Sequence, residues 1–185
     1  MTAIIVIAVL VVLVLVYIGM YNGLQKAKIN TEESWSQIDV QLKRRNDLIP
    51  NLVETVKGYA KHEQETLSQV VEARNQMVNV PDNVDANQLM QMSDQLSGSL
   101  KSLFAVAESY PDLKANQNFL NLQEELTTTE NKIAYARQLF NSSAAVYNQK
   151  LVTFPSNMVA KMHKFTKVNY LETPQEEKVA PKVQF

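Results

Sequence analysis

The feature that most constrains this chain is an uncharged stretch at its N-terminus, residues 2–21. From Ala3 to Ile18 every residue is apolar or aromatic. A helix of this length rises about 30 Å, which matches the hydrocarbon thickness of a bilayer. Tyr17 and Tyr21 fall at the downstream end, where aromatic rings settle at the level of the lipid headgroups. The stretch therefore predicts a transmembrane anchor at residues 1–23.

A cleaved signal peptide is the alternative for this stretch. Signal peptides carry a basic segment, a shorter apolar core of about 7–15 residues and small residues at the cleavage point. No Lys or Arg precedes the core here, and residues 19–22 make a poor cleavage site. The chain contains no cysteine, which excludes a lipid-modified cysteine anchor. An uncleaved span is the prediction.

The charges that flank the span predict its orientation. Lys26 and Lys28 lie just downstream, and no basic side chain lies upstream. Under the positive-inside rule, the N-terminus faces outward and the C-terminal domain is cytoplasmic. We therefore expect a single-pass protein of the bacterial cell (inner) membrane.

The composition after the span is that of one helical domain. Eighteen Lys and Arg residues balance nineteen Asp and Glu residues, so nothing indicates a nucleic-acid partner. Glycine is scarce, with four residues in the chain. Together with the hydrophobic periodicity, this predicts an all-α fold. We expect four amphipathic helices, at residues 24–48, 51–78, 84–108 and 116–153.

Prolines and heptads organise these helices. Pro50 is expected to separate the first two, and Asp82 or Asn83 to cap the third. The fourth helix carries apolar side chains at intervals of seven, a pattern typical of left-handed bundle packing. These are Phe119, Leu126, Ile133, Phe140 and Tyr147. Short turns between the helices favour an antiparallel up-down-up-down four-helix bundle over residues 24–154.

Three segments carry a family resemblance. They read YNGLQKAKINTEESWSQIDVQLKRRNDLIPNLVETVKGYAKHEQETL, YPDLKANQNFLNLQEELTTTENKIAYARQLFN and FPSNMVAK, followed by a closing APKVQF. The chain from Tyr21 onward resembles the LemA family of bacterial membrane proteins. The resemblance implies one N-terminal span and a helical-bundle domain, but no reaction.

A polar block at residues 43–47 is the first candidate site. Its consecutive cations point about 100° apart on a helix, so they cannot share one face. Either they form a solvated rim, or one or two meet acidic residues of the fourth helix; a catalytic role ranks third. We predict interhelical polar pairing for Trp35, Asp39, Arg44, Arg45, Asn51, Glu125, Glu130, Asn131 and Arg137.

Neither a metal nor a cofactor is expected. Di-iron bundles use Glu-x-x-His on two helices, and neither His62 nor His163 has Glu three residues before it. No P-loop, dinucleotide-binding glycine pattern or GxSxG turn occurs in the sequence. The sequence therefore favours a protein that is not an enzyme.

Residues 155–170 predict a short basic amphipathic helix, with its amphipathic part at 157–168. This helix either lies on the inner membrane surface or packs its apolar face on the end of the fourth helix. The residues expected to touch lipid are Met158, Lys161, Met162, Lys164, Phe165 and Lys167.

Two further features have open interpretations. Gly19 and Gly23 form a GxxxG pair, which suits either association of two spans or a flexible joint below the membrane. The tail, residues 171–185, ends in an alternating APKVQF that suits strand addition to a partner, docking on the bundle or a frayed terminus.

The sequence therefore predicts a membrane-anchored scaffold or adaptor without catalytic activity. It would act through self-association as a homo-oligomer, through contacts with other membrane proteins, and next to membrane lipids. The long heptad face of the fourth helix and the GxxxG pair are the features that favour self-association. The alternative is a lipid-binding or membrane-remodelling protein that uses residues 157–168. A third reading is an enzyme or metal carrier built on the carboxylates of the fourth helix.

Overall fold

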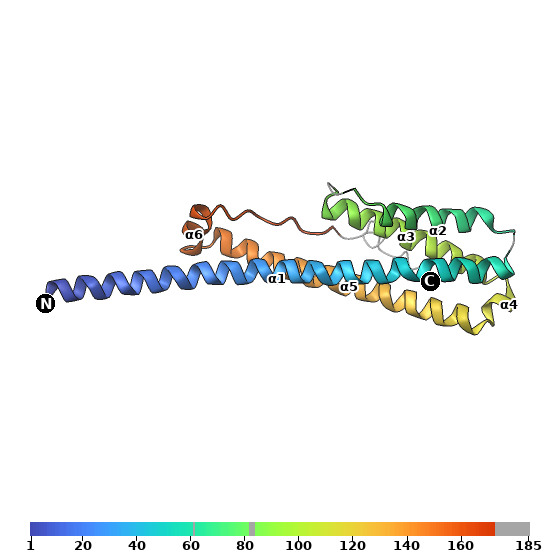
Figure 1. Cartoon of the computed structure of the whole chain (residues 1–185), viewed down its shortest axis with the longest axis horizontal. Helices are drawn as coiled ribbons and strands as arrows, with labels where there is room; N and C mark the ends of the chain where they lie inside the picture. Colours follow the sequence, from blue (N-terminus) through green and yellow to red (C-terminus); the bar gives the residue numbers. More distant parts are fainter. Residues whose placement is uncertain (61, 82–83, 173–185) are drawn as a thin grey trace, which may run out of the picture. The chain divides into compact units, whose positions relative to one another are not determined.

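The computed structural model describes residues 1–60, 62–81 and 84–172, and the regular structure of these residues is helical (Figure 1). An all-α fold, with a long apolar N-terminal helix followed by several packed helices, is thereby confirmed. The helices are α1 (Thr2–Tyr59), α2 (Gln64–Val78), α3 (Ala86–Ala107), α4 (Pro111–Lys114), α5 (Gln117–Val152) and α6 (Ser156–Met162).

The N-terminal part of α1 is long and apolar enough to cross a membrane. Its most apolar window has a mean hydropathy of 3.2, and none of that window is buried against the rest of the described chain. Among the described residues, α1 is the one helix that meets these criteria of length and composition. Because apolar side chains in water are unfavourable, this exposed segment suggests membrane anchoring.

The chain forms two compact units. The span unit comprises Met1–Gln37 and Ala136–Tyr170. The bundle unit comprises Ile38–Tyr135, together with Leu171 and Glu172 among the described residues. Both α1 and α5 contribute residues to each unit.

In the bundle unit, α1, α2, α3 and α5 run in alternating directions (Figure 1). Their inward faces supply an apolar core, which follows from the helical spacing of these side chains. The most deeply buried members include Ile49, Leu52, Val70, Leu96, Leu103, Leu113 and Ile133.

The start of α3 is capped by the side chains of Asp85 and Gln88. Asp85 accepts hydrogen bonds from the backbone N–H groups of Asn87 and Gln88, and the Gln88 side chain accepts one from the Asp85 N–H. Such a capping box satisfies donors that a helix start otherwise leaves free. The expected caps, Asp82 and Asn83, lie outside the described residues.

Side chains also close the bundle end that carries α4. The Tyr110 hydroxyl donates to Glu63 Oε1 at 2.8 Å, and Asn116 Nδ2 donates to the Tyr59 hydroxyl at 2.9 Å. The hydrogen bond to the negatively charged Glu63 raises the pKa of Tyr110, and burial raises it further. The residue before α4 is thus tied to the residue that precedes α2, and the loop after α4 is tied to the end of α1.

The expected helix break at Pro50 is wrong, because α1 continues through it to Tyr59. Proline has no N–H, so the carbonyl of Asn46, four residues earlier, loses its helical partner. Arg74 of α2 replaces that partner, with Nε donating to the Asn46 carbonyl oxygen at 3.3 Å. The chain reverses instead after Ala60, before α2 begins.

The heptad stripe of α5 is buried within the protein. Its five members are at most 5% exposed, and they face the cores of the two units. The stripe therefore supplies intramolecular packing, and it is unavailable for contacts with a second chain.

In the span unit, α1 packs on the C-terminal part of α5 through small and aromatic side chains. Trp35 meets Phe140 edge to face, with ring centroids 5.6 Å apart. Ser34 and Ser143 share a hydrogen bond of 3.0 Å between their hydroxyls. Small residues at such a contact allow two helices to approach closely.

We expect Pro50→Ala to raise the free energy of unfolding by about 1–3 kcal/mol, because alanine restores the missing helical hydrogen bond. Arg74→Met should cost about 1 kcal/mol in the wild type and less beside Pro50→Ala, where Asn46 has another donor. Urea unfolding of the four variants measures this coupling. Lys132→Met, at an exposed position, is the control; equal Arg74→Met losses in both backgrounds contradict the account.

Candidate functional site

The most unusual polar group in the bundle unit is the Arg45 side chain, which is 0% exposed. Arg45 lies on α1, among core residues. Burying a charge is costly unless it is paired and hydrogen-bonded, so its surroundings decide whether it is structural or reactive.

Three partners from two other helices surround the Arg45 guanidinium. Nη1 donates to Glu130 Oε2 on α5 at 2.6 Å and to Ser97 Oγ on α3 at 2.9 Å. Nη2 donates to Ser93 Oγ at 2.6 Å and to the Ser93 carbonyl oxygen at 3.2 Å. Ser97 Oγ also donates to Glu130 Oε1 at 2.8 Å. We call these four residues the Arg45 cluster.

Helical spacing explains why these partners converge. Ser93 and Ser97 are four residues apart, so they lie on the same face of α3. Their short side chains replace apolar ones at the point where the guanidinium enters, next to the buried Leu96 and Leu100. The Arg45 cluster thus joins α1, α3 and α5 through charge-assisted hydrogen bonds.

The other predicted polar residues are dispersed. Arg44 faces Glu125 at 3.7 Å, and both side chains are about half exposed, so this is a surface pair of small energetic value. Trp35 belongs to the span unit, where it packs on Phe140. Arg137 is half-buried in the same unit. The exposed positions are those of Asp39, Asn51 and Asn131.

A second cluster lies in the span unit, where α6 meets α1. The Tyr17 hydroxyl and His163 Nε2 share a hydrogen bond of 2.6 Å. The rings of Tyr21 and His163 lie 4.7 Å apart. Val159 and Ala160 of α6 are buried in one apolar cluster with side chains of α1 and α5. These contacts hold α6 beside the residues that end the apolar stretch.

The helix at this point is shorter than expected. It ends at Met162, and Lys164 adopts a left-handed φ of 56°. The Phe165 N–H then bonds back to the Ala160 carbonyl at 3.0 Å, which is the closing bond of a Schellman motif. A helix through residue 168 is therefore wrong, and Lys164, Phe165 and Lys167 lie beyond its end.

Two α5 side chains hold the segment after α6. Tyr147 donates to the Thr166 carbonyl at 3.0 Å. Asn148 makes two hydrogen bonds with the backbone of Val168. Its Nδ2 donates to the Val168 carbonyl oxygen at 2.8 Å, and its Oδ1 accepts from the Val168 N–H at 3.0 Å. Burial raises the pKa of the Tyr147 hydroxyl, and the negative charge of Glu32 raises it further.

The predicted lipid-facing residues divide between two environments. Met158 and Met162 are 61% and 66% exposed, and Lys161, Lys164 and Lys167 are exposed as well. Phe165 is half-buried and packs on the apolar cluster. The alternative packing on α5 and α1 therefore applies to Val159, Ala160 and Phe165. Met158 and Met162 remain mostly exposed, although the Met162 sulfur accepts a hydrogen bond from the Tyr17 hydroxyl of α1 at 3.8 Å.

The GxxxG pair has two different surroundings. A Cβ added at Gly19 would meet nothing within 4 Å, but one at Gly23 would lie 3.7 Å from Lys150 Nζ. Gly23 therefore faces the end of α5 in its own chain, and only Gly19 keeps an open surface for a second span.

Potential metal ligands do not gather in the part of the chain that the structure describes. No group of three or more His, Asp or Glu residues there has the arrangement to hold a metal ion. A groove of about 1090 Å³ runs along α2 and the end of α1, lined by residues that include Val53, Lys57, Leu67 and Glu72. It is open to solvent.

Several residues of these two clusters were not predicted from the sequence. Ser93 and Ser97 interrupt an apolar stripe at a spacing of four, a signal that a buried polar partner was needed. Tyr17 was identified as a headgroup-level ring, but its partner His163 lies 146 residues away in the sequence. No local pattern links two such positions.

Comparisons with known proteins show one family and several relatives. The family model for LemA matches residues 34–185. The protein LemA of Metamycoplasma hominis is 29% identical over 165 residues, which cover 89% of this chain and 74% of that protein. The magnetosome protein MamQ of Magnetospirillum gryphiswaldense is 26% identical over 173 residues, covering 81% of this chain and 64% of that protein. Magnetosome protein MamQ 1 of Paramagnetospirillum magneticum is 25% identical, again with 64% of its length covered.

The two members of the Arg45–Glu130 ion pair should respond unequally to mutation, because only the arginine is buried. Glu130→Ala leaves a buried guanidinium without its carboxylate, so it should lower the free energy of unfolding by about 3–5 kcal/mol. Arg45→Met leaves a glutamate that is 44% exposed and can be hydrated, so its cost should be under about 2 kcal/mol. Urea unfolding measures both. Glu125→Ala, from the surface pair, should cost at most about 1 kcal/mol, and a larger loss for Arg45→Met than for Glu130→Ala contradicts this assignment.

Tyr147 should make the protein sensitive to alkali. Its pKa is raised in the folded state, so its stabilising contribution is complete below the ordinary tyrosine pKa of about 10 and is lost as the pH rises through the folded value. Tyr147→Phe removes a hydrogen bond and should cost about 1 kcal/mol at pH 8, but its stability should fall less steeply above about pH 10. Unfolding at several pH values tests this, and parallel curves for both proteins refute it. Tyr135→Phe, at an exposed position, is the control at pH 8.

Proposed function

The chain belongs to the LemA family, and we propose that this membrane-associated helical protein is a scaffold or adaptor without catalytic activity. It would be anchored by the N-terminal part of α1 and would act through self-association and contacts with other membrane proteins. The observation that carries this proposal is the outward face of α5.

The outward face of α5 is poor in charge. Residues that recur there every three or four positions are exposed, as expected for one stripe of a helix. Only Glu124 among them is charged. In the bundle unit the stripe comprises Leu120, Glu124, Thr127, Thr128, Asn131 and Tyr135; in the span unit it comprises Gln138, Ser142, Ala145, Val146 and Gln149.

Such a stripe is suited to helix–helix contact. Tyr135 is 67% exposed and Val146 is 53% exposed, so both present apolar surface to solvent. Surfaces that are depleted of charge and carry an exposed aromatic ring are typical of the centres of protein interfaces. Because the heptad stripe is buried within the protein, it cannot contact a second chain. We therefore assign self-association to the opposite, exposed face of α5.

The Arg45 cluster supports a structural rather than a catalytic role. Its hydrogen bonds run between side chains and backbone of the same chain, and the arginine is wholly buried. A group that acted on a substrate would have to be reached by it. We therefore assign the cluster to holding α1, α3 and α5 together.

Charge supports an orientation with the C-terminal domain in the cytoplasm. Lys26 and Lys28 follow the apolar stretch, whereas residues 1 and 2 carry no basic side chain. Such asymmetry favours retention of the basic side on the cytoplasmic face of a bacterial inner membrane. Cysteine-scanning with a membrane-impermeant thiol reagent tests this directly, because the natural sequence contains no cysteine.

Self-association through α5 should be visible in the mass of the full-length protein in nanodiscs or detergent. We expect light scattering to give a discrete multiple of the chain mass. Tyr135→Glu should weaken association at least tenfold, since it places a charge at the centre of the proposed contact.

The matched control is Val78→Glu, which adds the same charge at a 51%-exposed position on α2. It should leave the mass unchanged. A wild-type protein that is monomeric, or a Tyr135→Glu variant of unchanged mass, would overturn self-association through this face.

A further inference from the structure

The α6 segment presents apolar side chains that the protein itself does not cover. Phe154, just before α6, is 75% exposed, and Met158 and Met162 are 61% and 66% exposed. The two methionines are four residues apart and therefore share one face of α6. We call Phe154, Met158 and Met162 the α6 apolar patch.

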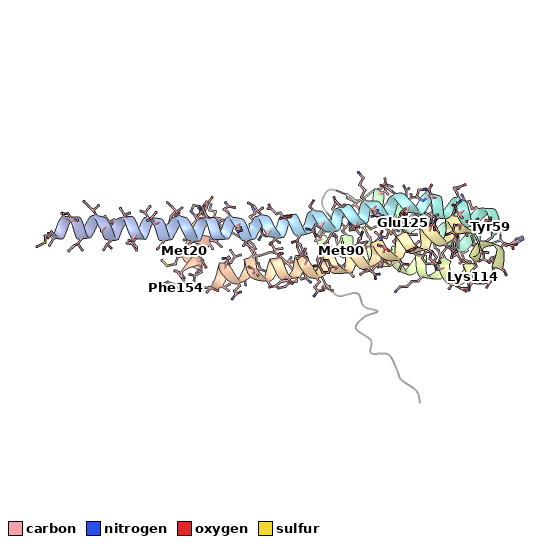
Figure 2. All side chains as sticks on the ribbon, turned by 90° about the horizontal axis from the view of Figure 1, so that it is seen from below. Met20, Tyr59, Met90, Lys114, Glu125 and Phe154 are labelled. Atoms are coloured by element: carbon pink, nitrogen blue, oxygen red, sulfur yellow. The ribbon has the colours of Figure 1, made fainter. Side chains whose placement is uncertain are left out.

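The position of α6 along α1 is fixed by specific contacts. His163 bonds Tyr17 and stacks near Tyr21, while Val159 and Ala160 pack in the cluster that contains Leu24. Figure 2 shows Met20 of α1 and Phe154 at the same level along α1, with the N-terminal part of the helix extending beyond both.

That position coincides with the end of the membrane span. The apolar stretch closes at Ile18, and Tyr17 and Tyr21 lie where aromatic residues mark the boundary between hydrocarbon and headgroups. If α1 spans the bilayer, its contacts with α6 bring the α6 apolar patch to the headgroup level.

The charge of the span unit matches an anionic surface. Its acidic residues are Glu32 and Glu33 alone, and both lie on α1. Its cations exceed them by five, and three of these cations flank the α6 apolar patch. The cations are Lys26, Lys28, Arg137, Lys150, Lys161, Lys164 and Lys167.

We propose that α6 is a second membrane contact: the α6 apolar patch inserts at the headgroup level, and Lys161, Lys164 and Lys167 bind anionic phospholipid. Apolar side chains with cations beside them are the composition of segments that lie in the membrane interface. Long lysine side chains can place their ammonium groups among lipid phosphates while their stems stay in the interface. This contact depends on the anchor and is independent of self-association through α5.

Spin labels on single cysteines test the insertion in the full-length protein, because the chain has no native cysteine. The protein is reconstituted in nanodiscs that contain phosphatidylglycerol, and the label is placed by Met158→Cys. Its accessibility to oxygen and to a water-soluble nickel chelate gives its depth. We expect preferential oxygen accessibility at a depth near the headgroups.

Two control labels define the accessibilities expected in hydrocarbon and in water. Leu10→Cys lies within the span and should report hydrocarbon, whereas Val78→Cys on α2 should report water. A Met158 label that behaves like the Val78 label overturns the proposal. So does one that is shielded from both reagents, because that indicates a protein partner on the patch. A Leu10 label outside hydrocarbon would instead refute anchoring itself.

Binding of anionic lipid by the three lysines is tested by varying the lipid composition of the nanodiscs. Replacing neutral phosphatidylcholine nanodiscs by phosphatidylglycerol-containing ones should move the Met158 label deeper. Reversing all three charges (Lys161→Glu, Lys164→Glu and Lys167→Glu) should abolish that shift. The matched control reverses Lys43, Lys114 and Lys132, which are exposed in the bundle unit, and should preserve it. A shift that survives in the first triple variant, or is lost equally in the second, overturns binding by these lysines.

Discussion

The rest of the structure depends on the backbone of α1, which must satisfy its hydrogen bonds in two different surroundings. Within a bilayer only internal hydrogen bonds are available, so the apolar stretch has to be an unbroken helix. In the bundle unit the same helix passes through Pro50, where one carbonyl loses its partner. Arg74 supplies a donor from α2, so the helix continues and the chain turns ten residues later.

Polar side chains are used in this protein mainly to position helices. In the bundle unit, Arg45 binds a carboxylate and two serines across three helices. In the span unit, Asn148 and Tyr147 hold an extended segment to α5 by bonds to its backbone. Burying a polar group without hydrogen-bond partners costs free energy. An alternative helix packing would separate these groups from their partners and would therefore be disfavoured. Such contacts support our proposal that surfaces, rather than a reactive centre, carry the function of this protein.

Much of the fold followed from periodicity. The boundaries of α3 and α5 came within two residues of expectation because their apolar positions recur at helical spacing between clear turn residues. The predicted helix break at Pro50 was wrong because a proline ends a helix only where the carbonyl four residues earlier finds no other donor. Here Arg74 of α2 supplies a donor for the Asn46 carbonyl. The end of α6 was predicted too late because Lys164 takes a left-handed conformation, which residue type alone does not indicate.

The sequence by itself determined that the chain has an apolar span, an all-helical body and a basic segment after Phe154, because these properties depend on side-chain type at short spacing. Tertiary structure alone decided that Arg45 pairs with Glu130 whereas Arg44 pairs with Glu125, and that His163 meets Tyr17. It also turned the heptad stripe of α5 inward and left the charge-poor face outside. These outcomes depend on contacts between residues far apart in the chain, and local spacing contains no information about which distant side chains will meet.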